Sequence, residues 1–394
     1  MANSALVMME DNSPEPSDNS SAGRTKKRDN VQPASQFALR ERIKVIGVGG
    51  GGNNALDHII RTGATGVEFL AINTDTHCLE KCLSVEKLML GERLTKGHGA
   101  GAMPEVGEQA ALESRDEIRA CLKGCDMVYL AAGMGGGTGT GALPIIAGIA
   151  REMGILTVSV VTRPFSFEGK KRKNFAEIGI EKLKQVVDAL IVVPNDKLLQ
   201  LSERTTSLTD AFAMADNVLR QAVQGVTDLV TKPGIINVDF ADLRSIMKHA
   251  GGAVMGIGMG SGEHRAKEAL RRAMESPLME NSMQGAKGVI LNVTAGSSVG
   301  IMEVEEAANH LHSQIDEDAN FMWGLVYDET MGEDIQMVVI ATGFLLSPAA
   351  EEPSGKPENK SQTPPGAERD QQDVLFSMDS PLDTPSYLRR KQRR

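Results

Sequence analysis

Short apolar runs bounded by turn residues recur through the first half of the chain and alternate with stretches of helical pattern. Runs of this kind are typical of parallel strands that are buried on both faces of a sheet. The clearest of them lie at residues 43–48, 69–72, 127–131, 157–161 and 189–193. Because helical stretches separate these runs, the pattern predicts βαβ units and a doubly wound parallel α/β sheet.

A helical period takes over after residue 206. The apolar positions are Phe212, Ala215, Leu219, Ala222, Val226 and Leu229. They recur at spacings of three and four, which predicts one long amphipathic helix at residues 207–232. Ser207, with Asp210 three residues later, resembles an N-terminal cap, and Pro233 followed by glycine ends the helix.

Composition changes sharply at both ends of the chain. The first residues are rich in Ser, Asn, Pro and charge, which predicts a disordered tail. A Pro-, Glu- and Ser-rich stretch near the other end predicts a flexible linker, and the basic terminus beyond it regains apolar anchors. The predicted organisation is a tail at 1–40, an α/β domain at 41–206, the central helix at 207–232, a smaller α/β domain at 233–346 with strands at 288–293 and 335–341, a linker at 347–376 and a recognition peptide at 377–394.

Charge and composition exclude several classes of protein. The net charge of −10 argues against a general nucleic-acid binder. No apolar stretch is long enough to span a bilayer and the first residues show no signal-peptide pattern, so we expect a cytoplasmic protein. The cysteines pair as Cys78/Cys82 and Cys121/Cys125, which allows a zinc site. The usual two-residue spacers are absent, so we favour small apolar residues and expect no metal ligands.

The most informative segment is the glycine run at residues 131–142, which follows an apolar strand. Glycines permit positive φ and let backbone N–H groups approach an anion closely. A helix that starts near Gly139 adds the positive end of its dipole, and Thr138 and Thr140 can donate from their hydroxyls. The segment therefore predicts a phosphate site.

A second glycine cluster at residues 47–54 also follows a strand and opens a helix. Alone it fits the cofactor turn of a nicotinamide-dependent dehydrogenase, with Asp75 placed as the ribose-binding acid. Two glycine loops at the carboxyl ends of different parallel strands point into one crevice, which favours a nucleoside triphosphate held from two sides. The segment at 97–102 can add backbone donors, and the P-loop pattern G-x-x-x-x-G-K-[ST] is absent.

Two charged pairs have both functional and ordinary interpretations. Glu168 and Arg172 are four apart, as in a surface ion pair or a ribose contact. Asp239 and Asp242 are three apart at a helix start, where acids commonly cap the helix. On local evidence, capping is the favoured interpretation of the second pair.

Taken together, these segments resemble the bacterial tubulin-like cell-division GTPase family FtsZ. The run Gly-Gly-Gly-Thr-Gly-Thr-Gly at 135–141 is the motif that this family shares with tubulins. The segments at 50–54, 167–172 and 237–242 are specific to the division branch and occur here in the family's order. The resemblance covers about residues 42–346 and the terminal peptide, and it implies a tubulin-like fold and GTP hydrolysis.

The resemblance also implies a site for GTP or GDP. Its phosphate contacts would be Gly50, Gly51, Gly52, Asn53, Asn54, Gly137, Thr138 and Gly139. Around the rest of the nucleotide it would use Ala100 and Gly101 at the γ-phosphate, Glu168 and Arg172 at the ribose, and Asp216 and Phe212 at the guanine. An acid suits guanine because it accepts from both N1–H and the exocyclic amine. Mg²⁺ would be bound through the phosphates.

In this family the loop that here carries Asn237, Asp239 and Asp242 completes the site of the next subunit in a head-to-tail homopolymer. The two aspartates would orient and polarise the attacking water. Hydrolysis would then depend on assembly, and a heterologous contact of this kind makes open filaments. A non-catalytic filament scaffold or a plasmid-partitioning relative is a further alternative, and the presence of both aspartates argues against a loss of hydrolysis.

The end of the chain resembles the family's Leu-Asp-x-Pro-x-Phe/Tyr-Leu-Arg peptide. The matching residues are Leu382, Asp383, Pro385, Tyr387, Leu388 and Arg389. The resemblance implies docking onto membrane-tethering division proteins, with Tyr387 and Leu388 as apolar anchors. Contact with the membrane would then be mostly indirect, at the midcell division site.

Overall fold

The computed structural model describes residues 41–200, 205–232, 236, 238–279, 283 and 285–344. The tail predicted at 1–40, the linker at 347–376, the terminal peptide and Asn237 therefore lie outside the described residues. Within the described part of the chain, no helix has both the length and the apolarity that crossing a bilayer requires.

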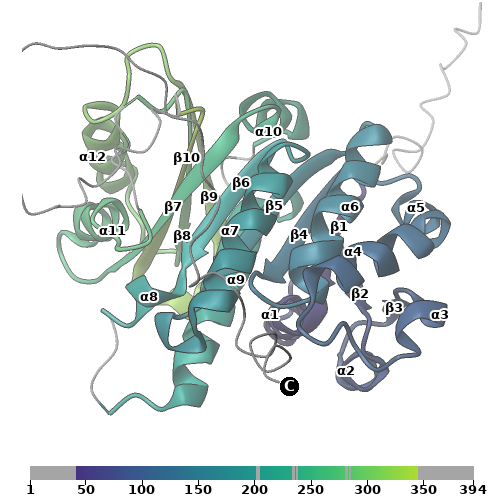
Figure 1. Cartoon of the computed structure of the whole chain (residues 1–394). Helices are drawn as coiled ribbons and strands as arrows, with labels where there is room; N and C mark the ends of the chain where they lie inside the picture. The colour runs from purple at the N-terminus through teal and green to yellow at the C-terminus, as the bar shows by residue number, and fades with distance from the viewer. Residues whose placement is uncertain are drawn as a thin grey trace, which may run out of the picture. The chain divides into compact units, whose positions relative to one another are not determined.

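Among the described residues, ten strands form one sheet in the order β3-β2-β1-β4-β5-β6-β7-β10-β8-β9 (Figure 1). The strands are β1 (Ile43–Val48), β2 (Glu68–Asn73), β3 (Glu86–Met89), β4 (Met127–Gly133), β5 (Leu156–Arg163), β6 (Ala189–Pro194), β7 (Gly251–Gly260), β8 (Gly288–Ala295), β9 (Asn320–Tyr327) and β10 (Ile335–Thr342). Pairing is parallel throughout, except that β10 runs antiparallel to β7 and β8. The predicted doubly wound parallel sheet is confirmed.

Strand β7 joins the sheets of the two predicted α/β units, which the sequence pattern did not indicate. It pairs with β6 through Ala189–Gly251, Leu190–Gly252 and Ile191–Ala253. Its sequence is glycine-rich and has little strand propensity. The reason lies in helix α11 (Arg265–Met274), because a Cβ on Gly258 would come within 2.0 Å of the Ala269 carbonyl oxygen. Glycine here allows the helix backbone to lie directly on the strand.

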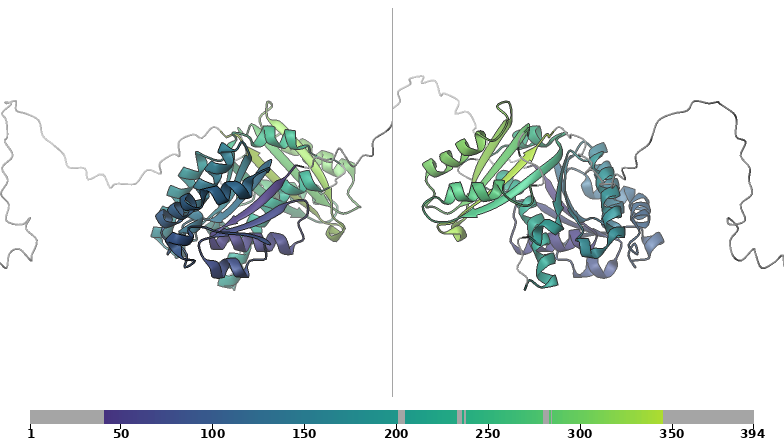
Figure 2. Two further views of the ribbon diagram at one scale, coloured as in Figure 1. Left: turned by 90° about the vertical axis from the view of Figure 1, so that its right-hand side faces the viewer. Right: turned by 60° about the vertical axis from the view of Figure 1, so that its left-hand side comes forward.

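Helices cover both faces of the sheet, and Figure 2 shows these layers from two sides. The remaining helices are α1 (Gly49–Arg61), α2 (Thr76–Lys81), α3 (Glu92–Thr95), α4 (Pro104–Glu113), α5 (Arg115–Leu122), α6 (Thr138–Glu152), α7 (Lys170–Lys184), α8 (Asn195–Leu198), α9 (Leu208–Thr231), α10 (Phe240–Met247) and α12 (Ile301–His312), with short turns η2 (Ser166–Glu168) and η3 (Glu329–Met331). Side chains of α1, α9 and α10 share one buried cluster, and those of α4 to α7 share another. Helices α11 and α12 close a third cluster over β8 and β10.

Helix α9 is the predicted central helix, and its buried side contacts both halves of the sheet. The Ser207 hydroxyl accepts from the Asp210 N–H at 3.1 Å, so the predicted N-terminal cap is confirmed. Its predicted apolar positions are buried except Phe212, which is 40% exposed. That exposure sets Phe212 apart from the core and places it at the mouth of a cavity.

Candidate nucleotide site

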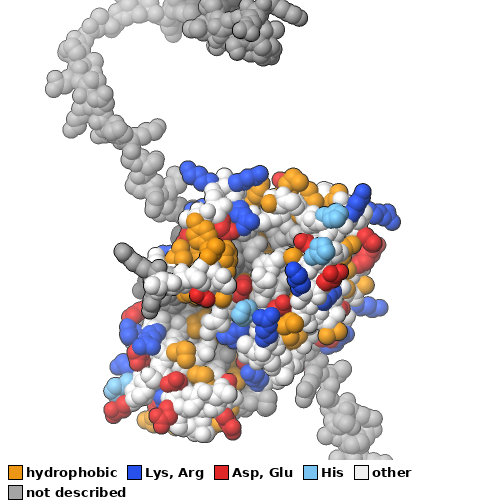
Figure 3. All heavy atoms as spheres, turned by 90° about the horizontal axis from the view of Figure 1, so that it is seen from below, with side chains coloured by type: hydrophobic (Ala, Val, Ile, Leu, Met, Phe, Trp, Pro, Cys, Tyr) orange, Lys and Arg blue, Asp and Glu red, His pale blue; other side chains and the backbone are white. Residues whose placement is uncertain are grey.

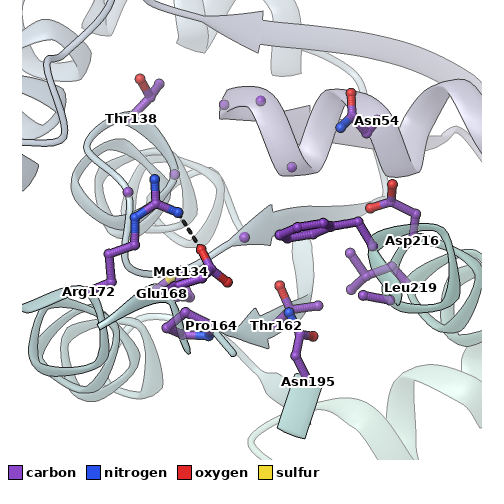
Figure 4. A pocket seen from close by; sticks show the side chains of 18 of the residues that line it. Asn54, Met134, Thr138, Thr162, Pro164, Glu168, Arg172, Asn195, Asp216 and Leu219 are labelled. Carbon is purple, nitrogen blue, oxygen red and sulfur yellow. Dashed lines mark hydrogen bonds and ion pairs between the residues drawn. The ribbon is translucent and has the colours of Figure 1, made fainter. Parts of the chain in front are cut away.

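A cavity of about 430 Å³ opens at the carboxyl ends of β1, β4, β5 and β6, and we call it the central cavity. Its lining is Gly49, Gly50, Gly51, Asn54, Gly133, Met134, Gly136, Gly137, Thr138, Gly139, Thr162, Pro164, Glu168, Arg172, Asn195, Phe212, Ala215, Asp216 and Leu219. Figure 4 shows Thr138 at one end of it and Asp216 with Asn54 at the other. The two predicted glycine loops and the start of α9 therefore meet in one place.

The glycines let the two loops pack directly on each other. A Cβ on Gly49, whose φ is +71°, would lie 2.9 Å from the Gly139 amide nitrogen. A Cβ on Gly51 would lie 3.3 Å from the Cα of Gly133. Side chains at these positions would separate the loops and fill the floor of the cavity. The sequence therefore leaves backbone N–H groups as the lining surface.

Two helices begin at this floor, α1 from the first glycine loop and α6 from the second. Neither helix, both fully described, has an acidic residue in its first turn. Their amino ends therefore present unpaired N–H groups and positive dipole ends that no local carboxylate neutralises. This end of the cavity has the chemistry of an anion site, and a chain of phosphates fits it.

Asp216, which belongs to α9, lies at the other end of the cavity, away from the two glycine loops. Burial raises the pKa of its carboxyl from the ordinary value of 3.8 to about 7. No described residue gives this carboxylate a hydrogen bond or an ion pair. A half-buried, unpaired acceptor fits a ligand that brings its own N–H donors.

Glu168 and Arg172 form the predicted ion pair on the cavity wall (Figure 4). Glu168 also accepts from the Phe165 N–H at 3.0 Å, which fixes its carboxylate at the start of η2. The Arg172 side chain remains half exposed. The pair thus holds η2 against α7, and it leaves guanidinium N–H donors at the cavity edge.

An aromatic cluster flanks the mouth. The rings of Phe165 and Phe167 stack at 4.9 Å between centroids, and Phe212 meets Phe165 edge-on at 5.3 Å. Phe167 is 57% exposed, and Leu208 at the start of α9 is 62% exposed. Figure 3 shows hydrophobic side chains gathered on this face of the molecule. Apolar groups at such exposure favour a flat ring or a second protein surface as a partner.

Two predicted phosphate residues, Gly52 and Asn53, lie behind the cavity rather than in its lining. Gly52 is buried, and a Cβ there would lie 2.2 Å from the Ala131 carbonyl oxygen. The buried Asn53 amide, in the orientation that its neighbours require, donates to the Gly47 oxygen at 2.9 Å. These residues hold the shape of the first glycine loop.

The segment at 97–102 packs on the second glycine loop from outside. A Cβ on Gly137 would meet the Ala100 Cβ at 2.8 Å, and Gly101 is exposed with φ of +58°. In this arrangement Ala100 and Gly101 flank the cavity without lining it.

Asp239 and Asp242, which we call the α10 acid pair, lie away from the central cavity. The Asp239 carboxylate accepts from the Asp242 N–H at 2.7 Å, so the predicted helix cap is present. Both residues are exposed. Arg244 on the same helix donates to the Gly154 oxygen, just before β5 begins, so α10 lies at the amino ends of these strands.

Sequence reasoning missed Asn195, which follows β6 directly. Its side chain is 4% exposed and lines the cavity, and its Oδ1 has no partner among the described residues. A buried orphan acceptor is costly, so it indicates a ligand donor. Its position at the carboxyl end of a parallel strand, like both glycine loops, was the available signal.

The alternatives weighed from the sequence fit less well. The Asp75 carboxylate accepts from the His77 and Cys78 N–H groups at 2.9 and 3.2 Å, so it caps α2 instead of facing the cavity. This removes the ribose-binding acid of the dehydrogenase interpretation. The cysteines are free thiols whose pKa values burial raises, and the described residues include no cluster that could hold a metal ion.

Comparisons with known proteins agree with this geometry. Residues 42–203 match the model of the Tubulin/FtsZ family GTPase domain, and residues 251–345 match that of the FtsZ family C-terminal domain. An empty FtsZ dimer from M. jannaschii is similar at 41% identity and a TM-score of 0.76, covering 78% of this chain and 90% of that one.

Two further solved structures are similar. A mutant FtsZ from M. jannaschii has 41% identity and a TM-score of 0.75, with 77% of this chain and 92% of that chain covered. CetZ2 from Haloferax volcanii, solved as a GTPγS-bound protofilament, covers 76% of this chain and 92% of its own at a TM-score of 0.64. At 18% identity, that likeness concerns the fold alone.

Proposed function

The chain belongs to the Tubulin/FtsZ family of GTPases, and on that premise we propose that it polymerises head-to-tail into filaments that build the cell-division ring. The family supports GTP binding and self-association, and an FtsZ relative is a dimer in its solved structure.

One observation carries the proposal of a shared active site. The central cavity opens at the carboxyl ends of the parallel strands, and the α10 acid pair lies at their amino ends. Figure 1 shows α10 at the top of the sheet and α1 and α8 at the bottom. A single chain cannot bring these groups together, but stacked copies in one orientation place the acid pair of one on the cavity of the next.

The chemistry of the two ends of the cavity determines the proposed orientation of the nucleotide. The phosphates lie against Gly50, Gly51 and the amino end of α6, where donors are unpaired. Guanine faces Asp216, Asn54 and Asn195, with Phe212 against its ring. Asn54 was expected from the resemblance at the phosphates, but it lies beside Asp216 at the other end of the cavity (Figure 4), so we propose it for the base instead. Mg²⁺ would be bound through the phosphates, because Glu168 already pairs with Arg172 and Asp216 lies at the other end of the cavity. When bound, the ion neutralises negative charge on the phosphates.

Hydrolysis is an in-line attack of water on the γ-phosphate. The neighbour's Asp239 and Asp242 orient this water, and a carboxylate accepts its proton as the new P–O bond forms. The bond between the γ-phosphorus and the β–γ bridging oxygen breaks in the same step, and GDP leaves with that oxygen. Asn237 of the same loop belongs to this set by resemblance and lies outside the described residues. Because the acids come from another subunit, turnover depends on assembly. The exposed Phe167 and Leu208 provide apolar area for that contact.

The terminal peptide is proposed to connect the filament to division proteins tethered at the membrane, on its cytoplasmic face at midcell. Its residues Leu382, Asp383, Pro385, Tyr387, Leu388 and Arg389 carry the resemblance to the family peptide. Deletion of 382–394 should leave GTPase activity intact and abolish recruitment to the membrane in cells.

A mixing experiment tests the shared site. Asp242→Ala retains the cavity and lacks an acid, whereas Asp216→Ala retains the acids and lacks the guanine acceptor. Each variant alone should be nearly inactive, and an equal mixture should regain up to about a quarter of wild-type activity, the statistical share of competent contacts. If mixing restores no activity while both variants still co-assemble, the acids do not act across subunits.

A further inference from the structure

Thr74 carries a fully buried hydroxyl directly after β2, with 0% of the residue exposed. Its Oγ1 lies 2.7 Å from the Oγ1 of Thr138, which lines the central cavity. No other described residue is a partner of the Thr74 hydroxyl. Its backbone groups are bonded elsewhere, to Asn73 Oδ1 and to the Gly99 N–H.

The direction of this hydroxyl–hydroxyl bond follows from burial. Each hydroxyl has one hydrogen to donate and can accept at its oxygen. The Thr74 hydrogen can reach only the Thr138 oxygen, whereas Thr138 can turn its own hydrogen into the cavity. If Thr138 donated instead, the Thr74 hydrogen would be buried without a partner, which is the costlier arrangement.

We propose that Thr74 is a positioning residue of the phosphate site. By donating to Thr138, it fixes the rotor of that hydroxyl so that the Thr138 hydrogen faces the cavity as a ready donor for a phosphate oxygen. Without Thr74, the Thr138 hydroxyl rotates freely and must be ordered when the ligand binds. This inference rests on the proposed binding of phosphates in the central cavity.

A buried network keeps Thr74 in place and links it to the other glycine loop. Asn73 Oδ1 accepts from the Thr74 N–H at 2.9 Å. The Asn73 amide donates to Asn53 at 3.1 Å, and Asn53 in turn donates to the carbonyl oxygens of the first glycine loop. The end of β2 is thus hydrogen-bonded to both glycine loops. The bonds run through Thr74 and Asn73, which do not line the central cavity.

The test compares Thr74→Val with the wild-type full chain in titrations with GTP and with guanosine. Valine keeps the shape and removes the hydroxyl, so GTP affinity should fall about five- to tenfold. Guanosine affinity should not change, because guanosine has no phosphate. Thr74→Ser restores the hydroxyl and should restore GTP affinity. Thr157→Val is the matched control, because Thr157 is also 0% exposed but lies at the start of β5, away from the cavity.

A double-variant cycle checks that Thr74 acts through Thr138. In a Thr138→Val background, Thr74→Val should cause no further loss of GTP affinity. Equal losses for GTP and guanosine, or additive losses in the cycle, would overturn the inference and indicate a general distortion. A loss seen only with Mg²⁺ present would mean that a Thr138 lone pair, not its hydrogen, faces the cavity, and it would also overturn the proposal. If wild-type chain bound guanosine but gained nothing from the phosphates, the proposed function would fail, not this inference alone.

Discussion

The central cavity and the α10 acid pair are opposites in almost every physical property. The cavity is concave and lined by glycines and backbone donors, and none of the described residues places a free carboxylate at the end proposed for the phosphates. The acid pair is exposed on a short helix, and its immediate role in one chain is to cap that helix. In the proposed mechanism, each region is incomplete for hydrolysis on its own. If the proposal holds, activity is a property of the contact between copies rather than of a single folded chain.

The largest effect that separates the two regions should come from Asp242→Ala. We expect turnover to fall by about a hundredfold or more while GTP affinity stays within about twofold, because only the transition state uses this carboxylate. Turnover is measured by phosphate release and affinity by titration. Glu317→Ala, which removes another exposed acid from the same half of the molecule, serves as control and should retain activity. A loss of GTP affinity in Asp242→Ala would place Asp242 in the binding site and erase the contrast.

Asp216→Asn should produce the converse result, a loss of binding. The carboxylate of Asp216 can accept hydrogen bonds from both donors of guanine, whereas the amide of Asn replaces one acceptor oxygen with an NH₂ donor. One guanine donor would then face another donor, so GTP affinity should fall about a hundredfold. Xanthine has a carbonyl where guanine has its exocyclic amine, so the variant should gain relative affinity for xanthosine triphosphate. Competition titrations of the two nucleotides measure this. An unchanged preference would mean that Asp216 does not read the base.

Proton binding at Asp216 gives a third test, specific to the cavity. Guanine binds the ionised carboxylate of Asp216. Because the pKa of this carboxyl is about 7, the carboxyl must lose its proton before guanine binds when the pH is below 7. GTP affinity should therefore be about tenfold weaker at pH 6 than at pH 8. In the nucleotide-free protein, the raised pKa acts the other way: its contribution to stability is present at low pH and decreases as the pH rises from 3.8 through about 7. The Asp216→Asn variant should lose this pH dependence of binding, and a pH dependence that persists there would assign it to another group.

The sequence was informative where local pattern determines the structure. The apolar runs, the Ser207 cap and the glycine loops each depend on neighbours in sequence, and the structure contains them. Strand β7 was not predicted, because its glycines are required by a tertiary contact. The backbone of α11 packs directly on the strand, and the pattern within β7 does not reveal that contact. The unpaired acceptor of Asn195 was missed for the same reason, since its burial depends on elements far along the chain.

The same limit applies to residue roles within a correctly located motif. Gly50 and Gly52 are neighbours in one glycine run, yet one lines the cavity and the other faces the Ala131 carbonyl. The direction in which each residue points depends on how the turn sits on β4. The sequence identifies the loop, but tertiary packing determines which of its residues line the cavity and which are buried behind it.

The smallest expected effect distinguishes the two roles of Asp239. As the cap of α10, its carboxylate accepts from the Asp242 N–H, and Asp239→Ala should lower the free energy of unfolding by about 1 kcal/mol. Asp239→Ser keeps a capping oxygen and should retain that stability. Both variants lack the carboxylate, so both should lose turnover to a similar extent if Asp239 also orients water in the next subunit. Denaturant unfolding and phosphate release, measured on the same preparations, separate the roles. Serine that restores both stability and turnover would reduce Asp239 to a helix cap and leave Asp242 as the one carboxylate of the pair acting across the contact.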